Sequence, residues 1–296
     1  MRYALFLGCT IPARARNYEL AARRIALEFG IELIDIEKFS CCGFPVKSIN
    51  GETSLLLSVR NLSLAEKKGL DICTLCSACT VNLTEANKEL KENSRLRDST
   101  NDKLGKIKRE YQGKIRVRHF ARILYEEIGL AKIKKKIKKD LSGLTFAAHY
   151  GCHYIKPSNV YDHFDDPEHP RTLDELIAVT GAKFVHYDSR KQCCGGALLA
   201  VDETLSLTLA KEKIEHIKSS GADAITLVCP FCSVMYDDNQ KKIESTFNVS
   251  YNLPVLYYPQ VLGLALGIEA KELGLNMNRV KTAELINRLE GKRNEP

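Results

Sequence analysis

The cysteines constrain this chain more than any other feature, because they form two copies of one pattern. Each copy contains a Gly-Cys, then a Cys-Cys-Gly and then a Cys-x-x-Cys. The first set is Cys9, Cys41, Cys42, Cys76 and Cys79, and the second set is Cys152, Cys193, Cys194, Cys229 and Cys232. Ten of the eleven cysteines thus belong to a repeat, which predicts two similar domains in the 296-residue chain.

The hydrophobic pattern supports this division, because both halves show the same order of strands and helices. In the first half we expect strand-like runs at residues 3–8, 31–36, 70–75 and 115–120, and helices at 14–29, 52–68, 82–112 and 121–128. In the second half the runs are 144–150, 182–187, 224–228 and 253–258, and the helices are 172–180, 197–220 and 260–266. This alternation predicts an α/β fold of two pseudo-symmetric, Rossmann-like domains with mainly parallel sheets. We also expect a C-terminal helical tail at residues 281–296.

We place the two domains at residues 1–140 and 141–296, with a basic linker at about residues 131–140. This linker contains the run from Lys132 to Lys139, and the whole chain carries a formal net charge of +7. Nucleic-acid binding would require basic residues interleaved with exposed aromatics, and the run contains none. We therefore interpret the run as a solvated linker or helix face and expect no nucleic-acid partner.

The chain contains no apolar run of the roughly 18 residues that a membrane span requires. The stretch from Leu5 to Cys9 is interpreted as a buried strand and not as a lipoprotein cleavage site, because it comes too early to follow a signal peptide. We expect a cytoplasmic protein without a membrane span. In such a reducing compartment, eleven cysteines indicate metal or redox chemistry and not a disulfide framework.

Each set of five cysteines follows the expected strand ends, where parallel sheets place their ligands. Five thiolates exceed the four that a structural zinc ion or an ordinary ferredoxin cluster uses. Gly43, Gly195 and Gly196 permit a turn in which two adjacent cysteines reach one polynuclear centre. The remaining cysteine, Cys73, has Thr226 as its counterpart, so we interpret it as a buried structural thiol.

The doubled motif resembles the cysteine-rich CCG domain pair, and the chain most resembles the B-subunit family of CoB–CoM heterodisulfide reductases of methanogens. The resemblance extends from Met1 to about Gly267. It implies two [4Fe–4S] clusters of the non-cubane type, one held by the five cysteines of the first set and one by the five of the second. All ten positions of the family pattern are filled.

The resemblance further implies a catalytic protein that reduces the mixed disulfide of coenzyme M and coenzyme B (CoM-S-S-CoB) to two thiols. Each cluster would act on one sulfur. Electrons would come from a flavin-containing partner protein through a ferredoxin-like iron–sulfur partner protein of the same complex. A hydrogenase or formate dehydrogenase module would be a further partner. Two alternatives remain: an iron–sulfur component of another oxidoreductase that acts on a quinone or a different disulfide, and an electron relay or zinc-stabilised scaffold without chemistry of its own.

Histidines are the first candidates for delivering protons to the product sulfurs. His153 follows Cys152 and is our candidate proton donor, because imidazole titrates near neutral pH. Its counterpart in the first copy is Thr10, so we expect proton chemistry in the second half. We interpret His149 as structural, and His163 and His169 as surface or pocket-rim residues of an insertion.

Cationic anchors are expected because the family's substrate carries sulfonate, phosphate and carboxylate groups. Lys211 and Lys213, on the helix after the second Cys-Cys-Gly, are the candidates. Lys213 is also considered as a proton donor. At an offset of 153 residues between the copies, its counterpart is Arg60.

Overall fold

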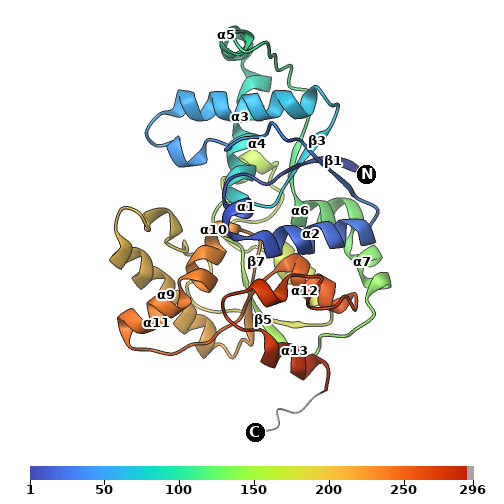
Figure 1. The fold of residues 1–296 in the computed structure, drawn as a ribbon, viewed down its shortest axis with the longest axis vertical. Coiled ribbons are helices and arrows are strands. Elements are labelled where there is room, and N and C mark those ends of the chain that lie inside the picture. Colours follow the sequence, from blue (N-terminus) through green and yellow to red (C-terminus); the bar gives the residue numbers. More distant parts are fainter. Residues whose placement is uncertain (292–296) are drawn as a thin grey trace.

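The computed structural model describes residues 1–291 and contains two four-stranded sheets of identical topology (Figure 1). The first sheet has the order β2-β1-β3-β4, with β1 (Arg2–Phe6), β2 (Glu32–Asp35), β3 (Asp71–Thr74) and β4 (Val117–His119). The second has the order β6-β5-β7-β8, with β5 (Thr145–His149), β6 (Lys183–Val185), β7 (Ala224–Leu227) and β8 (Val255–Tyr257). All pairings between these strands are parallel, which confirms the α/β fold of two pseudo-symmetric halves.

The strand register shows how closely the halves correspond. Ala4 of β1 pairs with Ile34 and Ile72, and Ala147 of β5 pairs with Val185 and Ile225. The central strands β1, β3, β5 and β7 are largely buried, as expected for parallel strands with helices on both faces. Their short apolar runs therefore identified the core strands from sequence.

The helices also follow one order in the two halves. The first half contains α1 (Thr10–Arg14), α2 (Arg16–Glu28), α3 (Gly51–Glu66), α4 (Ser77–Glu92), α5 (Ser94–Gly105), α6 (Phe120–Arg122) and α7 (Leu130–Lys136). The second contains α8 (Thr172–Ala178), α9 (Glu203–Ser219), α10 (Pro230–Ser233), α11 (Gln240–Phe247), α12 (Tyr258–Ala265) and α13 (Ala283–Leu289). Short 3-10 turns are η1 (Phe44–Val46), η3 (Ser158–Tyr161), η4 (Gly196–Leu198) and η6 (Leu275–Met277), and π-helical turns are η2 (Ile123–Ile128) and η5 (Val234–Asp238).

Three expected helix ranges were wrong in detail. The helix expected at 14–29 is α2, which begins at Arg16 because the backbone leaves the helical region at Ala15, and the short helix α1 before it was not expected. The helix expected at 197–220 is the turn η4 followed by α9, whose N-cap Asp202 accepts a hydrogen bond from the backbone N–H of Leu205 at 2.9 Å. The polar stretch 82–112 is helical only as far as Gly105. In the tail, α13 is helical, and residues 292–296 lie outside the described residues.

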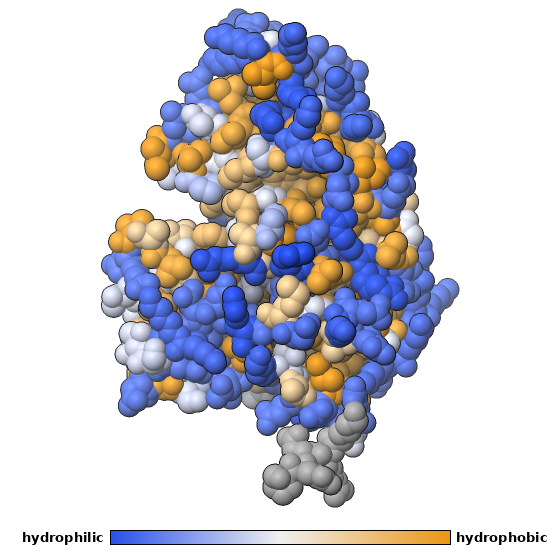
Figure 2. All heavy atoms as spheres, viewed as in Figure 1, coloured by the Kyte–Doolittle hydropathy of each residue, from blue (hydrophilic) through white to orange (hydrophobic). Residues whose placement is uncertain are grey.

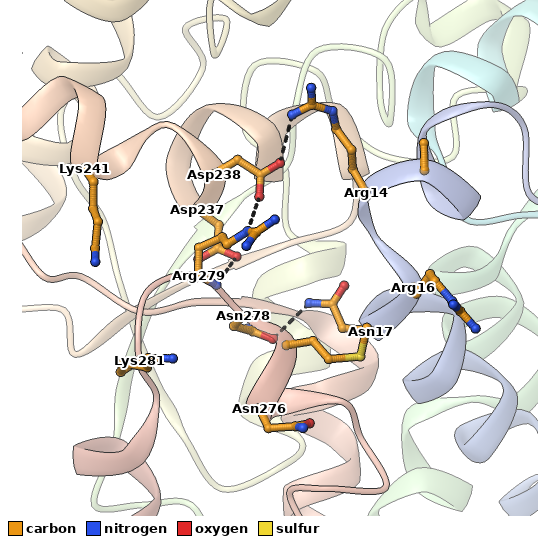
Figure 3. A pocket seen from close by; sticks show the side chains of 12 residues that line it. Arg14, Arg16, Asn17, Asp237, Asp238, Lys241, Asn276, Asn278, Arg279 and Lys281 are labelled. Carbon is orange, nitrogen blue, oxygen red and sulfur yellow. Dashed lines mark hydrogen bonds and ion pairs between the residues drawn. The ribbon is translucent and has the colours of Figure 1, made fainter.

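The two halves pack against each other through α2 and α12, which lie side by side in Figure 1. The ring of Tyr18 in α2 stacks on that of Tyr257 with centroids 4.0 Å apart. Asn17 donates a hydrogen bond to Asn278 at 2.9 Å, and Arg14 pairs with Asp238 at 3.5 Å (Figure 3). A domain boundary between residues 140 and 141 stays a prediction.

A search of residues 1–291 finds no helix with both the length and the apolar character needed to span a bilayer.

Candidate metal centre

The carboxyl ends of six parallel strands place the ten repeated cysteines at one edge of each sheet. Cys9, Cys41 and Cys76 follow β1, β2 and β3, and their counterparts follow β5, β6 and β7. Cys76 is the N-cap of α4, and Cys229 is the N-cap of α10. The topology thus brings residues far apart in sequence to one place, as the sequence predicted.

The sulfur atoms form one continuous line of side-chain contacts that runs through both sets. The order is Cys41, Cys42, Cys79, Cys76, Cys229, Cys232, Cys194, Cys193 and Cys152. Cys9 lies beside Cys41 and has Thr10 as a polar neighbour, with Sγ to Oγ1 at 3.8 Å. The two halves of this line correspond residue by residue. The sets therefore meet where Cys76 contacts Cys229.

The contacts along this line change the pKa values of the thiols. A hydrogen bond from Cys41, and a second one from Cys79, holds the pKa of Cys42 well below that of a free thiol. In the second set, hydrogen bonds from Cys152 and, to a smaller extent, from Cys194 lower the pKa of Cys193. Each set therefore contains a sulfur at which the thiolate, the metal-binding form, is favoured.

The Cys-Cys-Gly turns direct backbone N–H groups at the sulfurs. Gly43 donates to Cys41 and Phe44 to Cys42, each at 3.5 Å. Gly195 donates to Cys193 and Gly196 to Cys194, each at 3.4 Å. Gly43 and Gly195 adopt φ values of 94° and 79°, which only glycine adopts without strain. Such N–H donors stabilise thiolate and sulfide charge in iron–sulfur proteins.

Glycines also keep the space beside the sulfurs free of side chains. A Cβ atom on Gly8 would lie 2.8 Å from the Sγ of Cys79, and one on Gly151 would lie 3.5 Å from that of Cys232. On Gly196 it would lie 3.3 Å from the Sγ of Cys194. The all-thiolate donors, the backbone N–H groups and these glycine surfaces fit a polynuclear iron–sulfur group in each half.

Within residues 1–291, no three or more His, Cys, Asp or Glu side chains are arranged to hold a single metal ion. The sulfurs are instead spread along the contact line described above.

The sulfur line is buried at its centre and reaches the surface near its two ends. Cys9 and Cys193 are exposed, whereas Cys76 and Cys229 are buried. Figure 2 shows a notch between the lobe that carries α3 and the lobe that carries α9, the helices that follow the two Cys-Cys-Gly turns. The exposed ends of the line are where a substrate can reach the sulfurs.

Cys73 lies in β3, in register with Leu5 and Arg118, and is completely buried. Burial raises the pKa of its thiol far above that of a free cysteine, and no contact connects it to the sulfur line. The structure thus places Cys73 in the core, in agreement with its interpretation as a structural thiol.

His153 lies at the junction of the two halves. Its ring packs edge-on against Phe44, which follows the first Cys-Cys-Gly, with centroids 4.9 Å apart. Its Nδ1 is buried and has no hydrogen-bond partner among the described residues. A side chain from the second half thus contacts the turn of the first set. His163 and His169 are exposed, as expected.

Lys213 and Lys211 lie on different faces of α9. Lys213 is fully buried and donates a hydrogen bond to the carbonyl of Gln192, next to Cys193. Burial lowers the pKa of Lys213 to about 8, although the surrounding cysteines favour its charged form. Lys211 instead pairs with Glu215 at 2.7 Å and lies over the ring of Phe247, so the structure does not bring it to the sulfurs.

Arg60 is not the structural counterpart of Lys213. The N-caps of α3 and α9 are Asn50 and Asp202, which are 152 residues apart and not 153. At this offset the counterpart is Asn61, which is also fully buried and donates to the carbonyl of Cys41 at 3.0 Å. The extra residue of the second copy lies between Lys213 and β7, so it shifts the Cys-x-x-Cys alignment but not the alignment of the first part of the helix.

Sequence reasoning missed a buried polar group behind the second set, formed by His149 and Tyr236. Their rings pack edge to face with centroids 5.0 Å apart, and both residues are buried. Neither ring nitrogen of His149 nor the hydroxyl of Tyr236 has a partner among residues 1–291. A copy-to-copy comparison would have revealed them, because Phe6 and Leu83 occupy the matching positions.

A cavity of about 1040 Å³ lies at the junction shown in Figure 3, and no cysteine lines it. Its charged lining residues come from both halves of the chain: Arg14, Arg16, Asp237, Asp238, Lys241, Arg279 and Lys281. We therefore do not place the candidate centre in this cavity.

Comparison with known proteins identifies the family. Residues 3–84 and 146–237 both match the CCG cysteine-rich domain. The chain is 38% identical to the B subunit of the ferredoxin/F(420)H(2)-dependent CoB-CoM heterodisulfide reductase of Methanosarcina acetivorans, over 96% of each chain. It is 32% identical to the 8-methylmenaquinol:fumarate reductase membrane anchor subunit of Wolinella succinogenes, over 96% of this chain and 98% of the relative.

A crystal structure of a hypothetical protein from Helicobacter pylori has the same fold, with a TM-score of 0.77 and 21% identity over 95% of this chain and 52% of that one. The two domain matches and the full-length similarity lead to one conclusion. The chain belongs to the CCG-domain family that includes the B subunits of the CoB–CoM heterodisulfide reductases.

Proposed function

We propose that this protein is the catalytic iron–sulfur subunit of an oxidoreductase that reduces CoM-S-S-CoB to coenzyme M and coenzyme B. The observation that carries the proposal is the continuous line of sulfurs joining two equivalent sets. Cleaving a disulfide takes two electrons and leaves two thiolates, so a site with two equivalent halves matches the symmetry of the bond. The names of relatives over the full length support this substrate.

We assign one [4Fe–4S] cluster of the non-cubane type to each set of five cysteines defined above. When bound, such clusters supply single electrons at potentials set by their ligands and hydrogen bonds. The chain contributes the ten thiolates and the N–H donors of the Cys-Cys-Gly turns. It also keeps the middle of the sulfur line away from water, since Cys76 and Cys229 are buried.

Protons for the two product thiolates must come through the protein. His153 remains our proposed donor, because it lies between the two halves and its Nδ1 has no partner within the described chain. Lys213 is buried, so it acts on the sulfurs through its charge and not as a surface anchor. Lys211 is engaged with Glu215, which does not support its proposed role as an anchor.

The second candidate is an oxidoreductase component that exchanges electrons with a quinone. The observation in its favour is the 32% identity to the 8-methylmenaquinol:fumarate reductase protein over nearly the whole chain. Both candidates use the same ten cysteines. They differ in the molecule that accepts or supplies electrons at the exposed ends of the sulfur line.

The chain is proposed to work within a multisubunit complex. The matching relatives are named as B subunits, which implies other components. We infer a flavin-containing protein, a ferredoxin-like iron–sulfur protein and a hydrogenase or formate dehydrogenase module as partners. The cytoplasmic location also remains a proposal.

Iron and sulfide analysis of the anaerobically purified chain tests the cofactor. About eight iron atoms and about eight sulfides per chain, with brown visible absorption, are expected for two [4Fe–4S] clusters. One zinc ion without iron would show that the catalytic proposal is wrong.

A reduced-dye assay with the purified complex tests the substrate. CoM-S-S-CoB is compared with the symmetric disulfides of coenzyme M and coenzyme B and with a menaquinone analogue. Oxidation of the dye by the mixed disulfide alone supports the first candidate. Turnover of the quinone without turnover of the mixed disulfide supports the second.

A further inference from the structure

The cysteines of the two halves correspond one to one, but the buried side chains behind them do not. Behind the second set lie His149 at the end of β5, Tyr236 in the π-helical turn η5 and Lys213 in α9. The positions that match in the first half hold Phe6, Leu83 and Asn61. Two apolar side chains and a neutral amide thus correspond to an imidazole, a phenol and an ammonium group.

Cysteines of the second set lie within electrostatic range of all three polar side chains. The charged groups that act on His149 are Lys213, Cys229 and Cys193. Those that act on Tyr236 are Cys194, Cys232, Tyr187 and Cys193. The cysteines that act on Lys213 are Cys232, Cys194, Cys193 and Cys152. All five cysteines of the second set therefore lie near this polar group.

The donors of His149 and Tyr236 have no partner in the described part of the chain. A buried N–H or O–H group without an acceptor costs about 1–3 kcal/mol, and native proteins pair nearly all such groups. The π-helical turn that carries Tyr236 is a feature often found at functional sites. Since the cysteines of the second set lie within electrostatic range of both side chains, we expect the missing partners to belong to a group bound by these cysteines.

We infer that His149, Tyr236 and Lys213 raise the reduction potential of the centre in the second half above that of the centre in the first half. The inference rests on the proposed iron–sulfur function. Hydrogen bonds to cluster sulfur and a nearby cation stabilise the reduced state, which carries one more negative charge. In the first half, Phe6 and Leu83 supply no donor and Asn61 supplies no charge. The second centre is then the first of the two to accept an electron.

An EPR-monitored potentiometric titration of the iron-loaded chain with dithionite tests this inference. Two one-electron steps at different potentials are expected. In the double variant Cys41→Ser, Cys42→Ser the step at lower potential should be lost, which assigns the remaining step to the second centre.

The variants that test the residues are Tyr236→Phe, which keeps the ring and removes only the hydroxyl, and His149→Phe, which introduces the side chain of Phe6. Both should shift the second step to lower potential and leave the first unchanged. Tyr258→Phe is the matched control, because Tyr258 is a buried tyrosine whose hydroxyl also lacks a partner among the described residues, and no cysteine acts on it. This control should shift neither step.

The outcomes separate the inference from the function on which it rests. A chain without iron–sulfur centres overturns both. A chain with two centres of equal potential, or with potentials that neither Tyr236→Phe nor His149→Phe changes, overturns the inference and leaves the proposed function standing. If His149→Phe does not fold, Tyr236→Phe still decides, because its packing is almost unchanged.

Discussion

Cys193 and Cys73 are both cysteines near the end of the sheet, yet the structure gives them different surroundings. Cys193 is exposed and contacts Cys152 and Cys194, whereas Cys73 is buried within β3. Replacing Cys193 by alanine should remove the centre of the second set, about half of the bound iron and all disulfide reduction. Iron content and EPR spectra of the purified variant measure this loss.

Cys73→Ala is the control for that variant. It removes one buried sulfur atom and should lower the free energy of unfolding by about 1 kcal/mol, with iron content unchanged. Loss of iron from Cys73→Ala would show that Cys73 is a ligand and that its assignment to the core is wrong.

Asp237 makes the free energy of unfolding depend on pH. Burial raises the pKa of its carboxyl to about 6, although the backbone N–H groups of Val280 and Arg279 stabilise the charged form. Asp238 and Arg279 are the charged groups that face it, with opposite effects. A carboxyl whose pKa is higher in the folded state stabilises the fold at low pH, and this contribution disappears as the pH rises through about 6.

Asp237→Asn removes this titration. Relative to the variant, the wild-type chain should gain about 2 kcal/mol of unfolding free energy as the pH falls from 7.5 to 4. Urea denaturation of the metal-free chain across this range measures the difference. A difference between the two proteins that does not change with pH would contradict the prediction.

The sequence revealed the ten repeated cysteines but not all of their neighbours. The order of the motifs identified both sets, because the same order recurs in the two halves with similar intervals between Cys-Cys-Gly and Cys-x-x-Cys. It assigned Arg60 in place of Asn61 as the counterpart of Lys213, since one inserted residue between Lys213 and β7 changes the offset. It also interpreted His149 as structural, because a missing hydrogen-bond partner can be recognised only in three dimensions.

At the scale of elements, the Cys-Cys-Gly turns depend on glycine for their shape. A Cβ atom on Gly43 would lie 2.7 Å from the carbonyl oxygen of Ser54, and one on Gly195 would lie 2.9 Å from that of Ser206. The positive φ at both positions adds about 1–3 kcal/mol of strain for any other residue. Gly43→Ala should therefore abolish iron binding by the first set, and Gly195→Ala should abolish iron binding by the second set. Iron analysis of the two purified variants measures these losses.

Gly69→Ala is the control that tests whether backbone strain alone, away from the Cys-Cys-Gly turns, causes loss of iron. Gly69 also has a positive φ, of 64°, but a Cβ atom there would meet nothing within 4 Å. This variant should lower the unfolding free energy yet retain all of its iron. Equal iron loss from Gly69→Ala and Gly43→Ala would argue that strain alone, and not the turn beside the sulfurs, controls iron binding.

Strands were easier to predict from sequence than helix ends. The apolar runs located the central strands β1, β3, β5 and β7, because parallel strands buried on both faces are mostly apolar. The strands β2 and β6 are more exposed and contain charged residues such as Glu32 and Lys183. The start of α9 was predicted six residues too early, since the apolar pattern continues through η4 and only the Asp202 cap marks the boundary. The π-helical turn η5 has no such pattern in the sequence.

At the scale of the whole molecule, the contact between Cys76 and Cys229 makes the junction of the halves part of the candidate site. Tyr18 of the first half stacks on Tyr257 and donates a hydrogen bond at 3.3 Å to the carbonyl of Val228, which precedes Cys229. The repeat predicted two domains but could not show that their cysteine sets touch. That contact depends on how α2 packs against α12.

The junction should also protect the basic segment that connects the halves from cleavage by proteases. Lys136 donates a hydrogen bond to the carbonyl of Glu28 at the end of α2, and the backbone N–H groups of Lys138 and Lys139 bond to Ala265 at the end of α12, each at 2.9 Å. The lysine side chains are largely exposed, but the backbone is helical up to Lys136 and hydrogen-bonded at Lys138 and Lys139, so trypsin should cut faster when the segment opens. Its cleavage rate therefore reports on the free energy of opening the junction.

Tyr18→Ala should lower the unfolding free energy by about 3–5 kcal/mol and raise the rate of tryptic cleavage at residues 132–139 at least about tenfold, since 1.4 kcal/mol is a factor of ten. Tyr111→Ala is the matched control. Tyr111 is equally buried but bonds to Asn87 inside the first half, so its loss should cost similar stability without the same increase in cleavage at the segment. Equal cleavage rates in the two variants would mean that the halves do not open at the Tyr18 junction, and that their sulfur sets are held together by other contacts.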